Sequence, residues 1–286
     1  MRETLWTRGS RVLFGQMYED VELEMRAFEG CRRVFCIASA GCSAMALSAR
    51  HEVTAVDINA DQLNYARSRA AGAPAGVGRA EHVMAAGRQL VRIAGWTPGR
   101  LEAFVNLSDC NEQLRVWHSQ LARPLFRLLF DASIAGALSA LRLLTPLDSR
   151  LPARRFGVVM RTRLERGLAR FENALNPYAR SLFRGDRLER GEAGHRIRFE
   201  HADAAAYLET CPSGSFDAFS LSNILDGATA SYAQRLRAAV HSAASPEAIV
   251  ILRSFGEPRT PQEGTAAAED RAMIWGSIYR GPAQSF

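Results

Sequence analysis

The fold is decided by the stretch RVFCIASAGCSAMALSARHEVTAVDIN, which spans residues 33–59. Its beginning, residues 33–38, is a short apolar run typical of a buried strand, and the small residues after it predict a tight turn into a helix. A second apolar strand, residues 51–57, ends on the acid Asp57 and leads into a helix over residues 60–69. This order of strand, turn, helix, strand, acid and helix predicts the nucleotide-binding half of a Rossmann-like α/β fold.

Outward from this stretch the chain divides into three parts. Residues 1–32 predict an N-terminal helical segment. Residues 81–194 show helical periodicity only, whereas strands precede and follow them. We therefore expect residues 33–80 and 195–286 to form one Rossmann-like domain that a large helical insertion interrupts. The insertion is expected to be an acceptor-binding cap, and the alternative is a plain helical cap that packs its apolar face on the sheet.

The later strands are expected at residues 197–201, 216–221 and 248–252. Residues 257–270 contain two prolines among mixed polar residues, which favours a mobile loop. The long apolar stretch 125–144 contains three charged residues, so it is expected to be a helix that does not span a membrane.

The composition favours a globular protein with a sizeable core, because 47% of the 286 residues are hydrophobic and 23% are charged. All 36 basic residues are arginine, and the formal net charge is +6. Thirteen arginines but only five acids lie in residues 150–198, which predicts a cationic face for a phosphate, a carboxylate or an anionic membrane surface. The alternative is an ordinary solvated arginine surface. No module typical of nucleic-acid binding is found, and nucleic acid is not expected as a partner.

The five cysteines form no C-x-x-C pair, and residues 1–4 do not resemble the start of a signal peptide. We therefore expect reduced thiols and a cytoplasmic protein, with peripheral membrane contact as the variant that the cationic face would permit. The histidines are scattered without the spacing of metal ligands, so no metal is expected.

The turn after the first strand is expected to bind a nucleoside. Ala38, Ser39 and Gly41 have small side chains or none, so their backbone can approach a ligand at the start of a helix. Asp57 lies 19 residues after Ala38, close to the spacing of about 20 residues expected for an acid that binds ribose hydroxyls. The alternatives are an ordinary tight turn for the small residues and a helix N-cap for Asp57.

Polar residues also follow the two later strands. Asp203, after the third strand, is placed to meet the exocyclic amine of a nucleobase or else to cap a helix. Ser222, Asn223 and Asp226 follow the fourth strand, where polar groups line the ligand crevice of an open α/β sheet. We expect Ser222 and Asn223 to contact the bound nucleoside, and Asn223 and Asp226 to lie at the reacting centre. The alternative for Asp226 is again a helix N-cap.

The segments CIASAGCSA (residues 36–44) and VDINADQL (residues 56–63) resemble the S-adenosylmethionine:diacylglycerol 3-amino-3-carboxypropyl transferases of betaine-lipid synthesis. Three further segments support the resemblance: QMYED (residues 16–20), NPY (residues 176–178) and DRAM (residues 270–273), the last expected to be a C-terminal strand. The similarity therefore extends over most of the chain.

This resemblance implies a class I methyltransferase-type sheet in which Ala38, Gly41, Asp57 and Asn59 hold S-adenosylmethionine as co-substrate. Further contacts are expected from three residues of the same segments, Ser39, Ile58 and Gln62. The reaction implied is transfer of the 3-amino-3-carboxypropyl group to a hydroxyl acceptor, a lipid such as diacylglycerol or a small molecule, with release of methylthioadenosine.

A hydroxyl acceptor must lose its proton, and four residues are candidate bases. Asp226 ranks first, followed by Glu19 and Tyr18; His118 is the fourth, with an ordinary core or surface position as its alternative. Two other functions stay open. One is an ordinary class I methyltransferase with the same donor, and the other is a non-catalytic protein that binds S-adenosylmethionine or a membrane and serves in an interaction.

Overall fold

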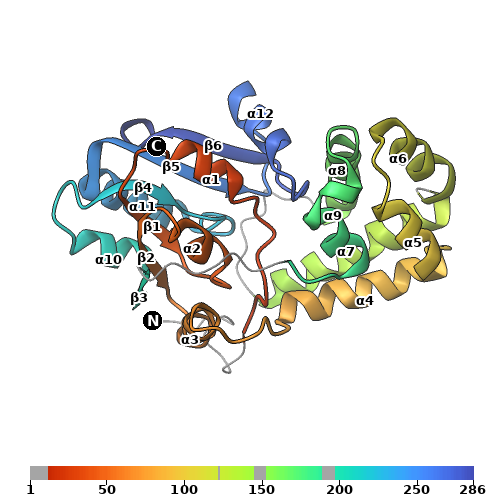
Figure 1. Ribbon diagram of the computed structural model, residues 1–286, viewed down its shortest axis with the longest axis horizontal. Helices are drawn as coiled ribbons and strands as arrows, with labels where there is room; N and C mark the ends of the chain where they lie inside the picture. Colours follow the sequence, from red (N-terminus) through yellow and green to blue (C-terminus); the bar gives the residue numbers. More distant parts are fainter. Residues whose placement is uncertain (1–11, 122, 145–152, 189–196) are drawn as a thin grey trace.

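The computed structural model describes residues 12–121, 123–144, 153–188 and 197–286 (Figure 1). Six strands form one sheet: β1 (Arg33–Ile37), β2 (Glu52–Asp57), β3 (Ile197–His201), β4 (Phe216–Ser220), β5 (Ala244–Ser254) and β6 (Ser277–Pro282). Their order in the sheet is β3-β2-β1-β4-β5-β6; the first five run parallel, and β6 pairs antiparallel with β5. This is the order of a Rossmann-like α/β sheet, whose topological switch point lies between β1 and β4.

The apolar residues of β1 explain its central place in the sheet. Val34 and Cys36 join the core on one face and Phe35 joins the core on the other, because side chains alternate along a strand. All three are fully buried. A strand that is covered on both faces needs such a continuous apolar run, and for this reason the sequence predicts the strand correctly.

Helices cover both faces of the sheet. One face carries α1 (Glu22–Ala27), α2 (Cys42–Leu47), α3 (Ala60–Ala70) and α12 (Pro261–Glu269). The other carries α10 (Ala204–Glu209), α11 (Ala230–Ala243) and the C-terminal 3-10 turn η3 (Ala283–Ser285). The sheet domain is therefore a three-layer α/β/α arrangement (Figure 1).

Every described element between α3 and β3 is a helix. These elements are α4 (Arg79–Ile93), α5 (Pro98–Val105), α6 (Cys110–Val116), the π-helix η1 (Trp117–Leu121), α7 (Pro124–Leu144), α8 (Ala153–Leu168), the 3-10 turn η2 (Asn173–Leu175) and α9 (Pro177–Arg184). Most of them share an aromatic core around Trp96, whose ring stacks on Phe126 with centroids 4.9 Å apart. The insertion is therefore a lobe with a core of its own, to the right of the sheet in Figure 1. Of the helices in the described ranges, none is long and apolar enough to cross a membrane.

Two arginines of α8 tie this lobe to the sheet domain. Arg163 is buried and donates Nη1 to the carbonyl oxygens of Phe255 (3.1 Å) and Ile274 (3.3 Å). Arg166 donates Nη2 to the carbonyl oxygen of Trp275 at 2.9 Å. A guanidinium can serve several carbonyls at once because it carries five N–H donors.

The prediction of an N-terminal helical segment is wrong for most of the described part. Only α1 is helical there, and residues 12–20 form an extended segment, here called the N-terminal strap. Side chains of other elements satisfy its backbone: Gln62 of α3 accepts from the amides of Leu13 (2.8 Å) and Phe14 (3.2 Å), and Glu81 of α4 accepts from Gly15 (2.8 Å). Residues 1–11 lie outside the described residues.

Two expectations near the C-terminus are also wrong. The stretch predicted as a mobile loop contains α12, whose start carries a capping signal: Thr260 is the N-cap and accepts from the amide of Glu263, and Pro261 takes the first helical position. Residues 270–273, predicted as a strand, form a turn after α12, and the last strand is β6. The turn is required because Asp270 and Arg271 bind the N-terminal strap.

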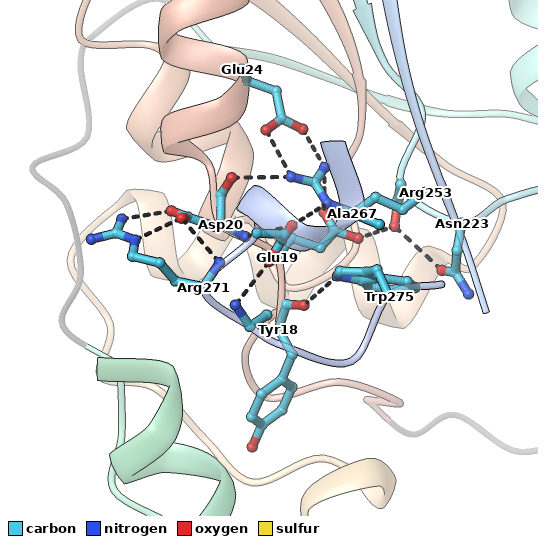
Figure 2. Close-up of polar contacts among 12 residues, drawn as sticks. Tyr18, Glu19, Asp20, Glu24, Asn223, Arg253, Ala267, Arg271 and Trp275 are labelled. Carbon is cyan, nitrogen blue, oxygen red and sulfur yellow. Dashed lines mark hydrogen bonds and ion pairs between the residues drawn. The ribbon is translucent and has the colours of Figure 1, made fainter. Parts of the chain in front are cut away.

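A buried ion network links the strap, α1 and β5 (Figure 2). Arg253 of β5 is fully buried; it donates Nη1 and Nη2 to the carboxylate of Glu24, Nε to Asp270 Oδ2 at 3.0 Å, and Nη2 to the carbonyl oxygen of Asp20 at 3.0 Å. Arg271 forms a bidentate pair with the Asp20 carboxylate, with both distances 2.6 Å. Charges inside a protein are tolerated only when paired in this way, so the network determines how α1 and the strap sit on the sheet.

The substitution Arg253→Met tests this network. It leaves the carboxylates of Glu24 and Asp270 buried without their guanidinium, and we expect the free energy of unfolding to fall by about 3–5 kcal/mol. Urea unfolding followed by circular dichroism measures the change. Arg32→Met is the matched control, because Arg32 pairs with Glu52 in an exposed ion pair and should change stability little. A loss for Arg253→Met no larger than that of the control would contradict the network's structural role.

Candidate functional site

The turn after β1 adopts an unusual backbone conformation at the sheet's switch point. Ser39 has a φ of 45° and Gly41 a φ of 81°, both in the left-handed region. Gly41 is the N-cap of α2, and a Cβ there would lie 3.1 Å from the Cβ of Ala66 on α3. Glycine is therefore required at position 41 both for its φ and for the close approach of α3. Ala38, which precedes the turn, is buried and donates its amide to Val56 of β2 at 2.8 Å.

Asp57 binds the backbone of this turn from the end of β2. Its Oδ2 accepts from the amide of Ser39 and its Oδ1 from the amide of Asn59, both at 2.9 Å. The N-cap alternative for Asp57 is wrong, because Asn59 caps α3 by accepting from the amides of Asp61 and Gln62. Burial raises the pKa of Asp57, and the two backbone amides partly oppose this rise. Each carboxylate oxygen uses one acceptor position here, so each can still accept a hydroxyl.

The neighbouring predicted contacts have different roles. Ile58 is 58% exposed just beyond the end of β2. Gln62 is buried, and its amide nitrogen donates to the carbonyl oxygens of Ser39 (2.9 Å) and Phe14 (3.0 Å), while its oxygen binds the strap. Gln62 therefore joins the turn to the strap, and its hydrogen-bonding groups are occupied by the protein.

A second strained serine lies at the end of β4, directly beside β1. Ser222 has a φ of 52°, and Ser39, Ser222 and Met273 are the non-glycine residues with positive φ in the described part of the chain. Two of the three thus lie at the carboxyl ends of the adjacent strands β1 and β4. Such strain costs of order 1–3 kcal/mol per residue and clusters at functional sites. The Ser222 hydroxyl donates to Glu19 Oε1 of the strap.

Asp226 organises the loop after β4. Its carboxylate accepts from the Ser254 hydroxyl (2.6 Å), the Phe255 amide (2.9 Å) and Nδ2 of Asn223 (3.2 Å). The N-cap alternative is wrong here too, because Thr229 caps α11. Three donors thus hold the Asp226 carboxylate, and through one of them Asp226 orients the side chain of Asn223.

Asp203 and His118 take the structural alternatives that the sequence left open. Asp203 is the N-cap of α10, where Oδ1 accepts from the Ala206 amide and Oδ2 from the Tyr232 hydroxyl, both at 2.9 Å. His118 is exposed on η1 in the insertion. Both were predicted as candidate site residues because the sequence around a single acid or histidine does not show which groups its side chain will contact.

Glu19 and Tyr18 come to the sheet on the N-terminal strap. Glu19 is buried; burial raises the pKa of its carboxyl, and Arg253, 4.0 Å away, partly opposes the rise. The backbone of both residues is held from distant elements, because Trp275 Nε1 donates to the carbonyl oxygen of Tyr18 (3.0 Å) and the Tyr178 hydroxyl donates to that of Glu19 (2.6 Å). Figure 2 shows Tyr18 and Glu19 beside Trp275.

Sequence reasoning missed the residues that hold the strap over α3 and α4. Arg69 is buried and donates Nη1 to the carbonyl oxygen of Gly15 in the strap at 3.5 Å and to that of Ala40 in the turn after β1 at 2.8 Å. Tyr65 donates its hydroxyl to the carbonyl oxygen of Gly15 at 2.7 Å. Glu81 accepts from the amides of Gly15 and Gly78 at 2.8 and 2.7 Å. No local signal marks their contacts with the strap and the turn, because these partners are backbone groups far away in the sequence.

Several arginines of the arginine-rich stretch, residues 150–198, are engaged by other groups of the protein. Five of them pair with acids: Arg161 with Asp131, Arg163 with Glu257, Arg180 and Arg184 with Asp186, and Arg198 with Glu200. Arg166 binds carbonyl oxygens. Arg150, Arg190 and Arg196 lie outside the described residues. Of these acids, Asp131 and Glu257 lie on other elements, whereas Asp186 and Glu200 lie close to their arginines in the sequence.

Two open depressions lie away from the switch point. One of about 520 Å³ is lined by the amino ends of β2, β3 and β4, with Arg33, Tyr207 and Cys211 in its wall. Another of about 640 Å³ lies beside the strap, with Arg26, Arg170 and Arg271 in its wall. Ligands of open α/β sheets bind at the carboxyl ends of the strands, so we place the candidate site at the switch point and not in either depression. In the described ranges, no three His, Cys, Asp or Glu side chains gather as a group that could hold a metal.

The carboxyl of Asp270 gives the network a pH dependence. Burial raises its pKa from 3.8 to about 6, although Arg253 opposes the rise. Between these pH values the folded protein holds a proton that the unfolded chain has released, so this group's contribution to stability falls as the pH rises from 4 to 6. We expect the difference in unfolding free energy between the wild type and Asp270→Asn to decrease across this window by an amount on the order of 2 kcal/mol.

Asp217→Asn is the matched control for this titration. Burial acts to raise the pKa of Asp217, but hydrogen bonds from Arg33 and the backbone outweigh it and lower the pKa. Its contribution to stability should therefore be lost as the pH falls, the opposite sign to Asp270. Urea unfolding at successive pH values measures both series, and a difference for Asp270→Asn that is flat or rises from pH 4 to 6 would contradict the assignment.

Comparison of the chain with protein-family models and with curated proteins found no match. The candidate site is therefore assigned from its own geometry: a carboxylate with acceptor positions to spare, two strained serines at the ends of adjacent strands, and a strap that brings Glu19 to one of them.

Proposed function

We propose that this chain is an S-adenosylmethionine-dependent transferase that moves the 3-amino-3-carboxypropyl group to a hydroxyl acceptor and releases methylthioadenosine. The observation that carries the proposal is the contact between Asp57 and the amide of Ser39 at the switch point. It holds a carboxylate and a small-residue turn against each other on neighbouring strands, the arrangement suited to a ribose and the backbone-facing part of a nucleoside.

The fold supports the donor in two ways. The Rossmann-like order of β1 to β5 supplies the crevice at the carboxyl ends of the strands, and the small residues after β1 let a ligand approach the backbone. The antiparallel β6 beside β5 departs from an all-parallel dinucleotide-binding sheet and is what we expect of a methyltransferase-type sheet. Fold alone does not establish activity, so the proposal depends on the site.

The three supporting segments of the family resemblance meet in space. The strap segment 16–20 contacts the insertion through Tyr178, whose hydroxyl donates to Glu19, and the C-terminal turn through Arg271, which pairs with Asp20. Asn176 in turn donates Nδ2 to the carbonyl oxygen of Arg271 at 2.9 Å. Segments separated by more than ninety residues thus form one cluster beside the switch point. Because the three segments contact one another, they support the family resemblance together and not only as separate short matches.

In the proposed reaction, the acceptor oxygen attacks the arm carbon that is bonded to the sulfonium. A C–O bond forms, the C–S bond breaks, and its electron pair leaves with sulfur in neutral methylthioadenosine. Positioning the arm rather than the methyl group before the nucleophile would carry most of the specificity. The acceptor's proton must pass to a base, and we propose Glu19 before Asp226 for this role. Its pKa is raised and it accepts from the Ser222 hydroxyl, which can relay a proton.

Identification of the released nucleoside tests the reaction. We expect methylthioadenosine when the full chain is incubated with S-adenosylmethionine and diacylglycerol or a small hydroxyl acceptor, measured by mass spectrometry. S-adenosylhomocysteine instead would identify a methyltransferase. Tight donor binding with neither product would favour the non-catalytic alternative. A parallel incubation without acceptor controls for spontaneous breakdown of the donor.

The variant Asp57→Asn tests the donor site separately. The amide keeps the size of the carboxylate but loses one acceptor oxygen, so ribose hydroxyls are left imperfectly paired. We expect S-adenosylmethionine to bind more weakly by about 1–3 kcal/mol, measured by titration calorimetry. Asp217→Asn makes the same chemical change at the amino end of β4. This position lies at the opposite end of the strands from the candidate site, so the variant should leave the affinity unchanged. Equal affinities for both variants and the wild type would place the ribose elsewhere.

A further inference from the structure

The helical insertion exposes an apolar surface on α4 and α7. Its five large side chains are Val83 (58% exposed), Leu90 (41%), Ile93 (71%), Leu125 (49%) and Leu128 (67%). They are five of the nine large hydrophobic side chains exposed in the described part of the chain. We call this set the α4–α7 face.

The face belongs to two helices that pack on each other. Val83, Leu90 and Ile93 recur at intervals of seven and three residues, so they lie along one side of α4. α4 and α7 are in contact, and Trp96, just after α4, stacks on Phe126, near the start of α7. The apolar residues at the end of α4 are thus brought near those at the start of α7, and Figure 1 shows the two helices running together along the lower edge of the insertion.

The charges around this face are positive. Arg92, Arg123 and Arg127 are exposed on the same two helices or beside them. Two of them bind neutral groups: Arg92 donates to the side chain of Gln89 and Arg123 to the backbone carbonyl oxygen of Ser119.

The acids of these helices do not offset that charge, because they are bound elsewhere. Glu81 accepts from backbone amides of the strap and of Gly78. Asp131 forms a bidentate pair with Arg161 of α8, with both distances 2.9 Å.

We propose that the α4–α7 face docks the protein on an anionic lipid bilayer. Apolar side chains on amphipathic helices insert into the boundary between headgroups and acyl chains, and arginines beside them meet anionic headgroups. A second copy of the chain is the poorer occupant, because a symmetric contact would bring Arg92, Arg123 and Arg127 of both copies together. The proposal goes beyond the proposed function and does not rest on the transfer chemistry.

The face is also linked to the candidate site. α4 begins where Glu81 holds Gly15 of the strap, and the strap carries Glu19 to Ser222. A bilayer against α4 would therefore contact the same helix that holds the strap, and the strap reaches the carboxyl ends of the strands. This placement would suit an acceptor that is itself dissolved in the membrane.

Co-sedimentation of the full chain with lipid vesicles tests the docking. We expect binding to vesicles of phosphatidylcholine mixed with phosphatidylglycerol, at least about tenfold weaker binding to phosphatidylcholine alone, and release by high salt. The double variant Ile93→Glu with Leu128→Glu should lose binding by at least about tenfold. Each of Arg92→Gln and Arg127→Gln should weaken it about fivefold. Because all four positions are exposed, the variants should keep the wild-type unfolding midpoint.

Leu175→Glu is the matched control, since Leu175 is 75% exposed on η2, outside the α4–α7 face. It should bind vesicles like the wild type. Three results would overturn the proposal: no binding to any vesicle, equal losses for the double variant and the control, or a dimer in analytical ultracentrifugation that the double variant abolishes. Vesicle binding without release of methylthioadenosine would leave the docking intact and count against the proposed function alone.

Discussion

The buried guanidinium of Arg253 is the group on which the rest of the structure depends. A full positive charge in the interior is tolerated only with its acids in place, and those acids are Glu24 of α1, Glu19 of the strap and Asp270 after α12. Its own backbone amide donates to the carbonyl oxygen of Ser222 at 2.7 Å. One charged residue therefore determines where the N-terminal segment lies and braces the strained end of β4.

The strap connects the ion network to the candidate site. It crosses from α3 and α4 to the end of the sheet, and its backbone hydrogen bonds are made by side chains such as Gln62 and Glu81. An extended segment bound in this way brings Glu19 to Ser222 without belonging to the sheet. The sheet domain and the insertion both hold it, so changes in either lobe are expected to reach the same carboxylate.

The two lobes divide the work of the proposed reaction. The sheet domain carries the small-residue turn, Asp57 and the two strained serines, which are suited to a nucleoside donor. The insertion has its own aromatic core. Several of its arginines pair with acids or bind carbonyl oxygens of the sheet domain. Its α4–α7 face stays exposed and combines apolar side chains with arginines, which suits a lipid surface. Donor and acceptor are thus expected to approach from different lobes and meet at the strap.

The sequence by itself determined the five parallel strands and the helical insertion, because apolar runs and helical periodicity are local patterns, but it did not place the antiparallel strand β6. It also placed Asp57 at the ligand end of β2, since the spacing from Ala38 follows from the βαβ unit. Only the tertiary structure decided which acids are free to act. Asp57, Asp203 and Asp226 look alike in sequence, yet the first binds the turn, the second caps α10 and the third orients Asn223. Hydrogen-bond partners far apart in the chain set these roles, and no local pattern encodes them.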